Sequence, residues 1–524
     1  MTLRVLEEAR GLLEAAAVEY RDDAVAVRQL REHSARLEEP LRVAIAGMVK
    51  AGKSTLLNAI IGEEIAPTDA GECTKVITWY RHGATPRITM HLRAGGTRDL
   101  PIRRDDGRLV IDLGSTPADE VERIDVEWPS KRLEDVTLID TPGIGSLSTE
   151  ISARSAEFLT PAESASEADA IIYLMRHLHS ADLGFLSAFH DTAVGRSSTV
   201  NAMAVLSRAD EIGAGRIDAL LSARTIAERY RTDGALRSLA LDVVPIAGLV
   251  AQSARTLRQR EFHALRQVAR LGRQARERML VSVDRFVRTD AGIDVSADDR
   301  KRLLDRFGMF GIRMSAVAIR SGYDDSTDLA DELYRRSGMD DLLRLVSDQF
   351  RSRSDALKAR NALAAIKALV ERRSTPHSAE LASAIERLEA NAHELRELAA
   401  LSTARTTGLG IPAAAAEEAE RLIGGSGVSS ARRLGLPDDA GPDELRGAAA
   451  DALQRWRAMS GSPLLDRAAA EVCQVVTRSC EALVLSVAPT SVERRRLTLV
   501  LQPEPSVGGS DEAQHPSGDS QHET

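Results

Sequence analysis

The chain has 524 residues, room for several domains, and its 43% hydrophobic and 28% charged residues are typical of a folded globular protein rather than a disordered one. The formal net charge of -9 argues against a generic polyanion-binding protein, and three cysteines cannot build a disulfide framework, so we expect a reducing compartment. No stretch approaches the roughly 18 consecutive apolar residues of a membrane span, so we expect any membrane contact to be peripheral.

Residues 1–39 are expected to form one or two amphipathic helices, because their apolar residues recur on one helical face and Pro40 follows them. Short β-type runs then alternate with helical stretches. The predicted strands are 41–47, 76–80, 87–90, 123–128, 136–140, 170–175, 202–206 and 242–246. Several of them are continuous apolar runs, which is typical of parallel strands covered on both faces. We therefore predict an α/β sheet wrapped by helices.

Helical periodicity dominates after the last of these strands. The clearest part is 381–399, where Leu and Ala recur with heptad spacing, which predicts long packed helices of coiled-coil type. The last residues are acidic and rich in Pro, Gly, Ser and Gln, which is typical of a disordered tail. The predicted organisation is an N-terminal helix (1–39), an α/β domain (40–252), a helical region (253–500) and a tail (501–524).

The segment 47–55 reads G-M-V-K-A-G-K-S-T and matches the phosphate-binding pattern G-x-x-x-x-G-K-[ST], in its required place between a strand and a helix. Backbone N–H groups and the helix N-terminus would hold the phosphates, Lys53 would reach the β and γ phosphates, and Ser54 would ligate Mg²⁺. The predicted nucleotide contacts of this loop are Gly47, Lys50, Ala51, Gly52, Lys53, Ser54 and Thr55.

Two further segments complete a predicted hydrolytic site. Asp140 and Gly143 belong to D-T-P-G at the end of the strand 136–140; the carboxylate can hold Mg²⁺ through water, and the glycine N–H can donate to the γ-phosphate. Thr74 is our candidate for a threonine that closes on Mg²⁺ and the attacking water, with Thr68 as the alternative. The predicted metal ligands are thus Ser54, Thr74 and Asp140.

Base recognition is predicted at S-R-A-D, which follows the strand 202–206 and contains Ser207, Arg208 and Asp210. An aspartate there can accept hydrogen bonds from guanine N1–H and N2–H₂, donors that adenine lacks. The stem of Arg208 can lie along the base. A backbone N–H toward guanine O6 would come from Ala247 or Gly248.

The side chain that orients the attacking water is not evident. Ile144 occupies the position after D-T-P-G where small GTPases often carry glutamine. Lys50 lies in the phosphate loop and can serve as an internal substitute for an arginine finger, the alternative being a lysine that faces solvent. The predicted catalytic residues are therefore Lys53, Thr74 and Lys50.

With these motifs, and an interval of 87 residues from Lys53 to Asp140, the chain resembles the bacterial dynamin-like GTPases, and longer strings are similar to the actinobacterial isoniazid-inducible branch. The resemblance covers about 1 to 500. It implies a P-loop GTPase head and an elongated all-α neck and trunk, with the N-terminal helix in the neck. It also implies GTP hydrolysis with Mg²⁺, self-association through the heads, a dynamin-like paralogue as a possible partner, and peripheral membrane remodelling at the cytoplasmic inner face of the plasma membrane.

Two segments are candidates for contact with anionic lipid. The segment 407–412, T-G-L-G-I-P, is apolar and rich in glycine, although an interhelical turn is the simpler interpretation. The stretch 255–278 has eight arginines and two glutamates, on a helix that binds lipid or RNA or is only a solvated neck face. Nucleic acid is not the expected partner. The alternatives to a membrane-remodelling GTPase are a switch GTPase that recruits an RNA or protein partner, and a scaffold that binds GTP with little hydrolysis.

Overall fold

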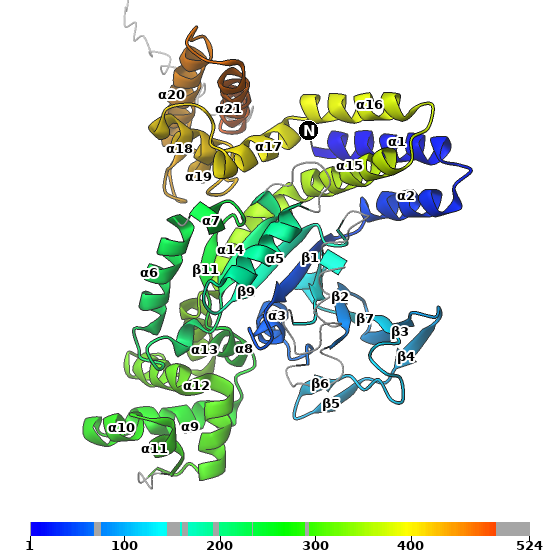
Figure 1. The fold of residues 1–524 in the computed structure, drawn as a ribbon. Helices are drawn as coiled ribbons and strands as arrows, with labels where there is room; N and C mark the ends of the chain where they lie inside the picture. The colour runs from blue at the N-terminus through cyan, green and yellow to red at the C-terminus, as the bar shows by residue number, and fades with distance from the viewer. Residues whose placement is uncertain are drawn as a thin grey trace, which may run out of the picture.

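The computed structural model describes residues 2–67, 75–143, 158–159, 166–191, 199–232, 234–288 and 293–488. A nine-stranded sheet in the order β11-β10-β9-β1-β8-β2-β7-β3-β4 forms the centre of the head (Figure 1). Its strands are β1 (Leu41–Gly47), β2 (Ile77–His82), β3 (Arg87–Leu92), β4 (Thr97–Leu100), β7 (Val121–Trp128), β8 (Val136–Asp140), β9 (Ala170–Met175), β10 (Ala202–Leu206) and β11 (Val243–Pro245). A separate hairpin contains β5 (Arg103–Asp105) and β6 (Arg108–Val110).

The middle of the sheet is parallel and fully buried. β1 pairs in parallel with β8 and β9, and β10 pairs in parallel with β9 and β11. Every residue of β1, β9 and β10 is buried, as continuous apolar runs predict. β2 pairs antiparallel with β8, so the sheet is mixed from that strand outward. The predicted α/β class is confirmed, and each predicted strand is present.

Helices cover both faces of the sheet. They are α3 (Lys53–Ile61), α5 (Ser180–Asp191), α6 (Ala219–Thr232), α7 (Gly234–Arg237) and α8 (Gly248–Arg255). Leu57 of α3 and Val250 of α8 share one buried cluster with Val43 of β1. Phe185 of α5 shares a second cluster with Ala44, whose side chain points to the opposite face of β1. The carboxyl ends of the parallel strands are thereby left to bind a ligand.

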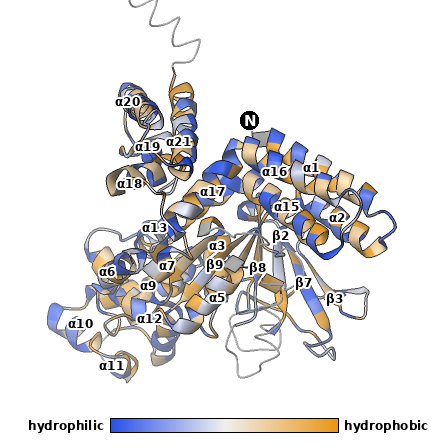
Figure 2. Ribbon diagram, turned by 45° about the horizontal axis from the view of Figure 1, so that its top comes forward, coloured by the Kyte–Doolittle hydropathy of each residue, from blue (hydrophilic) through white to orange (hydrophobic). Residues whose placement is uncertain are grey.

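The N-terminal helices pack against a later part of the chain. α1 (Thr2–Glu19) lies along α15 (Ser354–Arg372) and α16 (Ser378–Asn391), and α2 (Ala24–Arg36) lies along α15. Figure 2 shows hydrophobic and hydrophilic bands alternating on these four helices, as amphipathic helices require when one side is buried. Together they form a neck beside the amino end of β1.

The interval 253–500 contains two groups of helices that pack in different places. The first group packs on the head: α12 and α13 contact α8, and α14 contacts α3. It consists of α9 (Gln259–Arg270), α10 (Arg273–Met279), α11 (Val283–Arg288), α12 (Ala297–Arg320), α13 (Ser326–Arg336) and α14 (Met339–Gln349). The second group extends from the neck and consists of α17 (His393–Thr406), α18 (Ala413–Leu422), α19 (Ser430–Leu434), α20 (Pro442–Ser460) and α21 (Arg467–Ser486).

The heptad-spaced segment 381–399 is not one long helix, and the coiled-coil prediction is wrong there. α16 ends at Asn391 and α17 begins at His393, because Ala392 adopts extended backbone angles (φ -72°, ψ 110°). The break lets α17 turn to pack on α21, so tertiary contacts override the sequence spacing. Ala399, predicted on the apolar seam, is exposed.

The predicted lipid loop 407–412 turns its apolar residues inward. Leu409 is buried, and Ile411 packs against the same core cluster, so this loop is an interhelical turn. The predicted tail 501–524 lies outside the described residues. Among the helices of the described part of the chain, none combines the length and the apolar content that a bilayer crossing requires.

Candidate functional site

The loop between β1 and α3 has a backbone that requires glycine at its first position. Gly47 has φ 148°, and a Cβ built on it would lie 2.3 Å from the carbonyl oxygen of Leu174 on β9. Lys50 and Gly52 also have positive φ angles, 62° and 98°. α3 begins directly after the loop, at Lys53, so its free N–H groups are available to an anion. This arrangement suits a phosphate group.

Lys53, Ser54 and Asp140 converge beside this loop. Lys53 Nζ donates to the carbonyl oxygen of Gly47 at 3.3 Å, and Ser54 Oγ donates to Asp140 Oδ2 at 3.0 Å. Burial lowers the pKa of Lys53, and the Asp140 carboxylate opposes that shift. Burial also raises the pKa of Asp140 to about 6, against the opposing effects of Lys53 and Ser54. Two opposite charges are thus held in a desolvated space.

The oxygen atoms here fit a magnesium ion. Asp140 Oδ1 is buried without a hydrogen-bond partner, whereas Oδ2 contacts the hydroxyl of Ser54. Magnesium prefers a few protein oxygens supplemented by water and phosphate oxygens. Ser54 and Asp140 supply such a set, and an ion would satisfy the unpartnered carboxylate oxygen.

The D-T-P-G turn lies against the phosphate loop. A Cβ on Gly143 would come within 2.7 Å of Val49 Cγ2, so only glycine permits this approach. Thr141 Oγ1 donates to the carbonyl oxygen of Ile45 at 3.0 Å and fixes the turn to β1. Lys50, next to Val49, is exposed, so its ammonium group is free to approach a bound phosphate. Three further predicted positions lie outside the described residues: Thr68, Thr74 and Ile144.

The S-R-A-D segment follows β10, at the same carboxyl end of the parallel strands as the phosphate loop. Asp210 is buried in the short helix Ala209–Glu211, and burial raises its pKa to about 6, with the Glu211 carboxylate acting in the same direction. Arg208 has φ 52°, and its guanidinium donates to Glu211 Oε1 at 2.7 Å. Ser207 Oγ donates to the carbonyl oxygen of Met175 at 3.1 Å, so this hydroxyl holds two strand ends together.

The predicted backbone contact to guanine O6 requires a correction. The N–H of Ala247 donates to the carbonyl oxygen of Ser337 at 2.9 Å, so it is not available to a base. Gly248, the alternative, begins α8, where the first N–H groups have no partner within the helix. A Cβ on Gly248 would lie 3.7 Å from Thr55 Cγ2, which joins this position to the phosphate loop.

Sequence analysis missed a wall of the base site that comes from α12. Gly308 interrupts α12 with φ 62° and ψ 172°, and a Cβ there would lie 3.9 Å from Asp210 Oδ2 and 3.7 Å from Leu249 Cδ2. The string D-R-F-G-M-F-G contains this glycine. A glycine within a helical pattern indicates a kink, but it does not indicate that the kink lies against Asp210. The head site therefore includes a residue from beyond its predicted boundary at 252.

Comparison with known proteins agrees with this geometry. A sequence model described as the dynamin family matches residues 43–184, from β1 into α5. The isoniazid-induced protein IniC of Mycobacterium tuberculosis is 43% identical over 465 residues, which are 89% of this chain and 94% of that protein. The chain therefore belongs to the bacterial dynamin-like GTPases, and it binds and hydrolyses GTP.

Two other relatives match only part of the chain. The isoniazid-induced protein IniA of Mycobacterium tuberculosis is 35% identical over 150 residues, 25% of this chain and 23% of that protein. A bacterial dynamin-like protein of Nostoc punctiforme is 29% identical over 170 residues, 30% of this chain and 24% of that protein. These shorter matches cover only part of the chain, whereas the match to IniC extends over almost the whole length of both proteins.

Affinity for GDP is expected to fall as the pH is lowered through 6. The ionised Asp210 is the form that accepts both guanine hydrogen bonds, and burial raises its pKa to about 6 in the free protein. Protonation therefore competes with the base, and at about pH 5 we expect roughly tenfold weaker binding than at neutral pH. Calorimetric titration with GDP in EDTA is compared between wild type and Asp210→Asn, which separates Asp210 from Asp140, whose pKa is also raised to about 6. An affinity that is unchanged between the two pH values contradicts this assignment.

Proposed function

We propose that GTP hydrolysis with Mg²⁺ at this site drives self-association of the heads and remodelling of an anionic membrane, with the protein peripheral at the cytoplasmic face. One observation carries the proposal. The phosphate loop, the D-T-P-G turn and Asp210 all lie at the carboxyl ends of the parallel strands, while the amino ends of strands in the same sheet are bonded to the neck. In such a molecule, the loss of the γ-phosphate on hydrolysis can move the neck helices relative to the head.

The proposed roles follow from the positions. Lys53 neutralises the β and γ phosphates, and Ser54 and Asp140 hold the metal ion, which polarises the phosphate oxygens when bound. Thr74 closes over the attacking water, and Lys50 stabilises the negative charge that develops in the transition state. The base contacts are Asp210, the stem of Arg208 and the N–H of Gly248.

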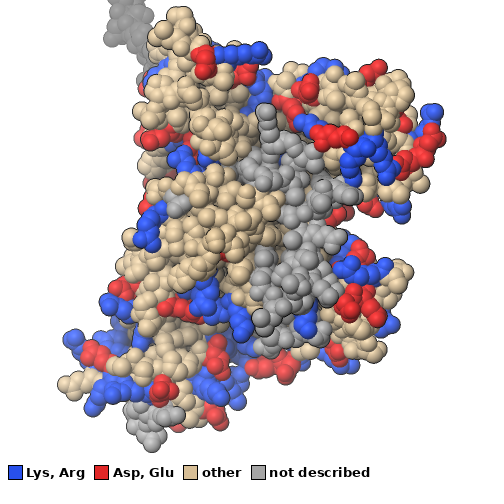
Figure 3. Space-filling model, in the orientation of Figure 1, with Lys and Arg blue, Asp and Glu red and all other residues tan. Residues whose placement is uncertain are grey.

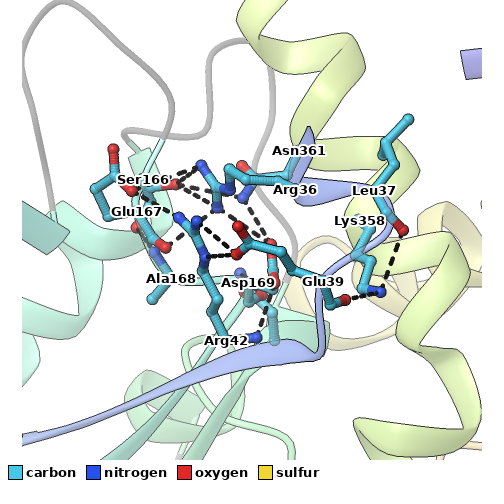
Figure 4. Close-up of polar contacts among 11 residues, drawn as sticks. Arg36, Leu37, Glu39, Arg42, Ser166, Glu167, Ala168, Asp169, Lys358 and Asn361 are labelled. Atoms are coloured by element: carbon cyan, nitrogen blue, oxygen red, sulfur yellow. Dashed lines mark hydrogen bonds and ion pairs between the residues drawn. The ribbon is translucent and has the colours of Figure 1, made fainter. Parts of the chain in front are cut away.

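A polar cluster joins the sheet to both sides of the neck (Figure 4). Arg36, at the end of α2, donates to the carbonyl oxygen of Ser166 at 3.1 Å and to Asp169 Oδ1 at 3.3 Å. Asn361 of α15 donates to the same two acceptors at 3.3 and 3.1 Å. Asp169 Oδ2 accepts from the backbone N–H of Arg42 on β1 at 2.9 Å. We call Arg36, Arg42, Ser166, Asp169 and Asn361 the neck latch.

The neck latch is connected to the phosphate loop through β1. Asp169 Oδ2 accepts from the backbone N–H of Arg42 near the start of β1, and β1 ends at Gly47, the first residue of the phosphate loop. Because the latch and the loop lie at the two ends of one buried strand, a change at the loop can alter the bonds to the neck. Arg36 and Asp169 are both buried, so their ion pair is costly to leave half formed.

Removing one arm of the neck latch is expected to weaken coupling without removing hydrolysis. Asn361→Ala deletes the α15 arm and leaves the Arg36–Asp169 pair in place. We expect the GTP-dependent change in distance between fluorophores on α1 and on the head to shrink about fivefold, with basal turnover within about twofold of wild type. The matched control is Arg28→Ala, an exposed residue of α2. An unaltered distance change in Asn361→Ala contradicts the latch.

The proposed function is tested by GTP turnover measured with and without vesicles that contain anionic lipid, together with electron microscopy of the vesicles. We expect turnover to rise with protein concentration and with vesicles, and the vesicles to be tubulated or divided only with GTP. If turnover depends neither on protein concentration nor on vesicles, and the vesicles keep their shape, the switch GTPase is favoured.

A further inference from the structure

The segment that follows the proposed base contact has an unusual backbone. Gly213, Ala214 and Gly215 have positive φ angles of 61°, 58° and 68°, shortly after the helix Ala209–Glu211 that contains Asp210. Alanine rarely adopts this left-handed conformation, because its Cβ comes too close to the following carbonyl oxygen. The segment therefore needs contacts from elsewhere in the molecule to keep its shape. We call 213–215 the left-handed segment.

Arg313 of α12 supplies such contacts. Its Nη1 donates to the carbonyl oxygens of Ala214 and Gly215, at 3.2 and 2.6 Å. Its Nε and Nη2 donate to the carbonyl oxygen of Leu280, at 3.0 and 2.6 Å, and Nη2 also donates to that of Val281 at 3.2 Å. All three guanidinium nitrogens are thus used, and the arginine joins the left-handed segment to the residues that follow α10.

Arg313 differs from the other basic residues around it. Figure 3 shows Lys and Arg side chains concentrated at the lower left, over the lobe that Figure 1 identifies as α9 to α12. Arg273 of this lobe, for example, pairs with Glu277 at 2.9 Å. Within the part of the chain that the structure describes, Arg313 pairs with no carboxylate, and burial lowers its pKa. A cation held at a cost among backbone carbonyl groups indicates that these carbonyl groups need to be fixed.

The left-handed segment lies against Asp210. A Cβ built on Gly215 would be 3.5 Å from the carbonyl oxygen of Asp210 and 3.4 Å from the backbone nitrogen of Phe310 on α12. Gly215 is therefore held between the backbone of Asp210 and that of α12. On the other side, a Cβ on Gly308 of the same helix would lie 3.9 Å from Asp210 Oδ2. Asp210 thus depends on α12 for the placement of both its backbone and its carboxylate.

We propose that Arg313 is a positioning residue for guanine recognition, which keeps the Asp210 carboxylate aligned with the base by holding the left-handed segment. This inference rests on the proposed contact between Asp210 and guanine, and adds a residue that acts on this contact from outside the site. The two hydrogen bonds from guanine N1–H and N2–H₂ require both carboxylate oxygens near the plane of the base, because misaligned hydrogen bonds weaken steeply. A segment released from its left-handed conformation would lose that alignment.

The alternative is that Arg313 only fastens two helices of the lobe to each other. The bonds to Leu280 and Val281 are sufficient for that purpose, since they already join α12 to the residues that follow α10. The bonds to Ala214 and Gly215 have no part in it, because they reach the loop that follows Asp210. A fastening role predicts a loss of stability with no change in preference between bases.

Arg313→Ala in the full-length protein tests the inference. We expect KM for GTP to rise about tenfold and kcat at saturating GTP to stay within about twofold, because the phosphate loop and the metal ligands are untouched. The preference for GDP over inosine diphosphate, measured by calorimetry, should fall about fivefold. Hypoxanthine lacks the N2 amine, so only the guanine nucleotide loses its second hydrogen bond. An unchanged preference contradicts the inference.

Arg313→Lys is the milder change and keeps the positive charge. One ammonium group cannot bond both connected segments as the fork of an arginine does, so we expect an intermediate loss of the preference for GDP. If a thermal melt shows that Arg313→Ala does not fold, Arg313→Lys decides between the two roles. The matched control is Arg320→Ala, which removes an exposed arginine two turns further along α12 and should retain the wild-type KM and preference.

The backbone of the left-handed segment offers a rescue. Glycine adopts positive φ angles without steric cost, so Ala214→Gly added to Arg313→Ala should restore about twofold of the lost preference. Recovery supports a role for Arg313 in holding the conformation of the segment. Absence of any recovery contradicts that role.

Asp210→Asn distinguishes this inference from the base contact on which it rests. The variant should itself lose much of the preference for GDP over inosine diphosphate. If it keeps that preference, the proposed base contact is wrong. If Asp210→Asn loses the preference while Arg313→Ala and Arg313→Lys keep it, the base contact stands and Arg313 only fastens the lobe.

Discussion

Lys53→Ala is expected to reduce GTP turnover by about 100- to 1000-fold, because the removed ammonium group neutralises phosphate charge in a desolvated site. The same substitution should not destabilise the nucleotide-free protein. Burial lowers the pKa of Lys53, so the charged lysine is held at a cost in the empty site. Steady-state phosphate release and a thermal melt without nucleotide measure the two effects. Turnover within a few fold of wild type would exclude Lys53 from the catalytic site.

Lys50 provides the comparison within the same loop. Its φ of 62° is tolerated by asparagine, so Lys50→Asn removes the charge while keeping the loop geometry. If Lys50 replaces an arginine finger, turnover should fall by about 1000-fold while the affinity for GDP is retained. Unchanged turnover in Lys50→Asn, under conditions where Lys53→Ala is inactive, identifies Lys50 as a solvent-facing lysine.

Asp210→Asn is expected to weaken GDP binding by about 100-fold, since it removes a charged acceptor of two hydrogen bonds. The asparagine amide should in turn favour xanthine, whose C2 carbonyl accepts from the new N–H₂ group while its N1–H still meets an oxygen. Calorimetry with GDP and with xanthosine diphosphate measures both changes. The loss of GDP affinity below pH 6 should be smaller in this variant than in wild type.

The control for base recognition is a neighbouring acid. Glu211→Gln alters the adjacent carboxylate, which helps to raise the pKa of Asp210 but pairs with Arg208 at the surface and is not a proposed base contact. We expect it to retain preference for guanine. Loss of that preference in Glu211→Gln, with none in Asp210→Asn, would reverse the assignment.

The sheet and its phosphate loop could be predicted because their signals are local. A continuous apolar run followed by a glycine-rich loop predicted β1 and the start of α3, and D-T-P-G and S-R-A-D each follow a strand as predicted. The short strands β4 to β6 were missed because they are largely exposed and mostly polar, so neither alternation nor burial marks them.

The parts that could not be predicted depend on contacts between distant segments. The N–H of Ala247 is used by Ser337, and Gly308 reaches Asp210, because helices late in the chain return to the head. The neck latch likewise joins positions more than one hundred residues apart, such as Arg36 and Ser166. Periodicity indicates that such helices exist, but not where they pack.

Calorimetric titration of the purified protein with a slowly hydrolysed GTP analogue and Mg²⁺ tests the central claim most directly. We predict heat of binding at one site per chain, weaker binding without Mg²⁺, and no detectable binding of the matching ATP analogue, because adenine offers Asp210 no donors. Absence of heat with the GTP analogue, or tighter binding of the ATP analogue, would contradict the assignment of the loop and of Asp210 together.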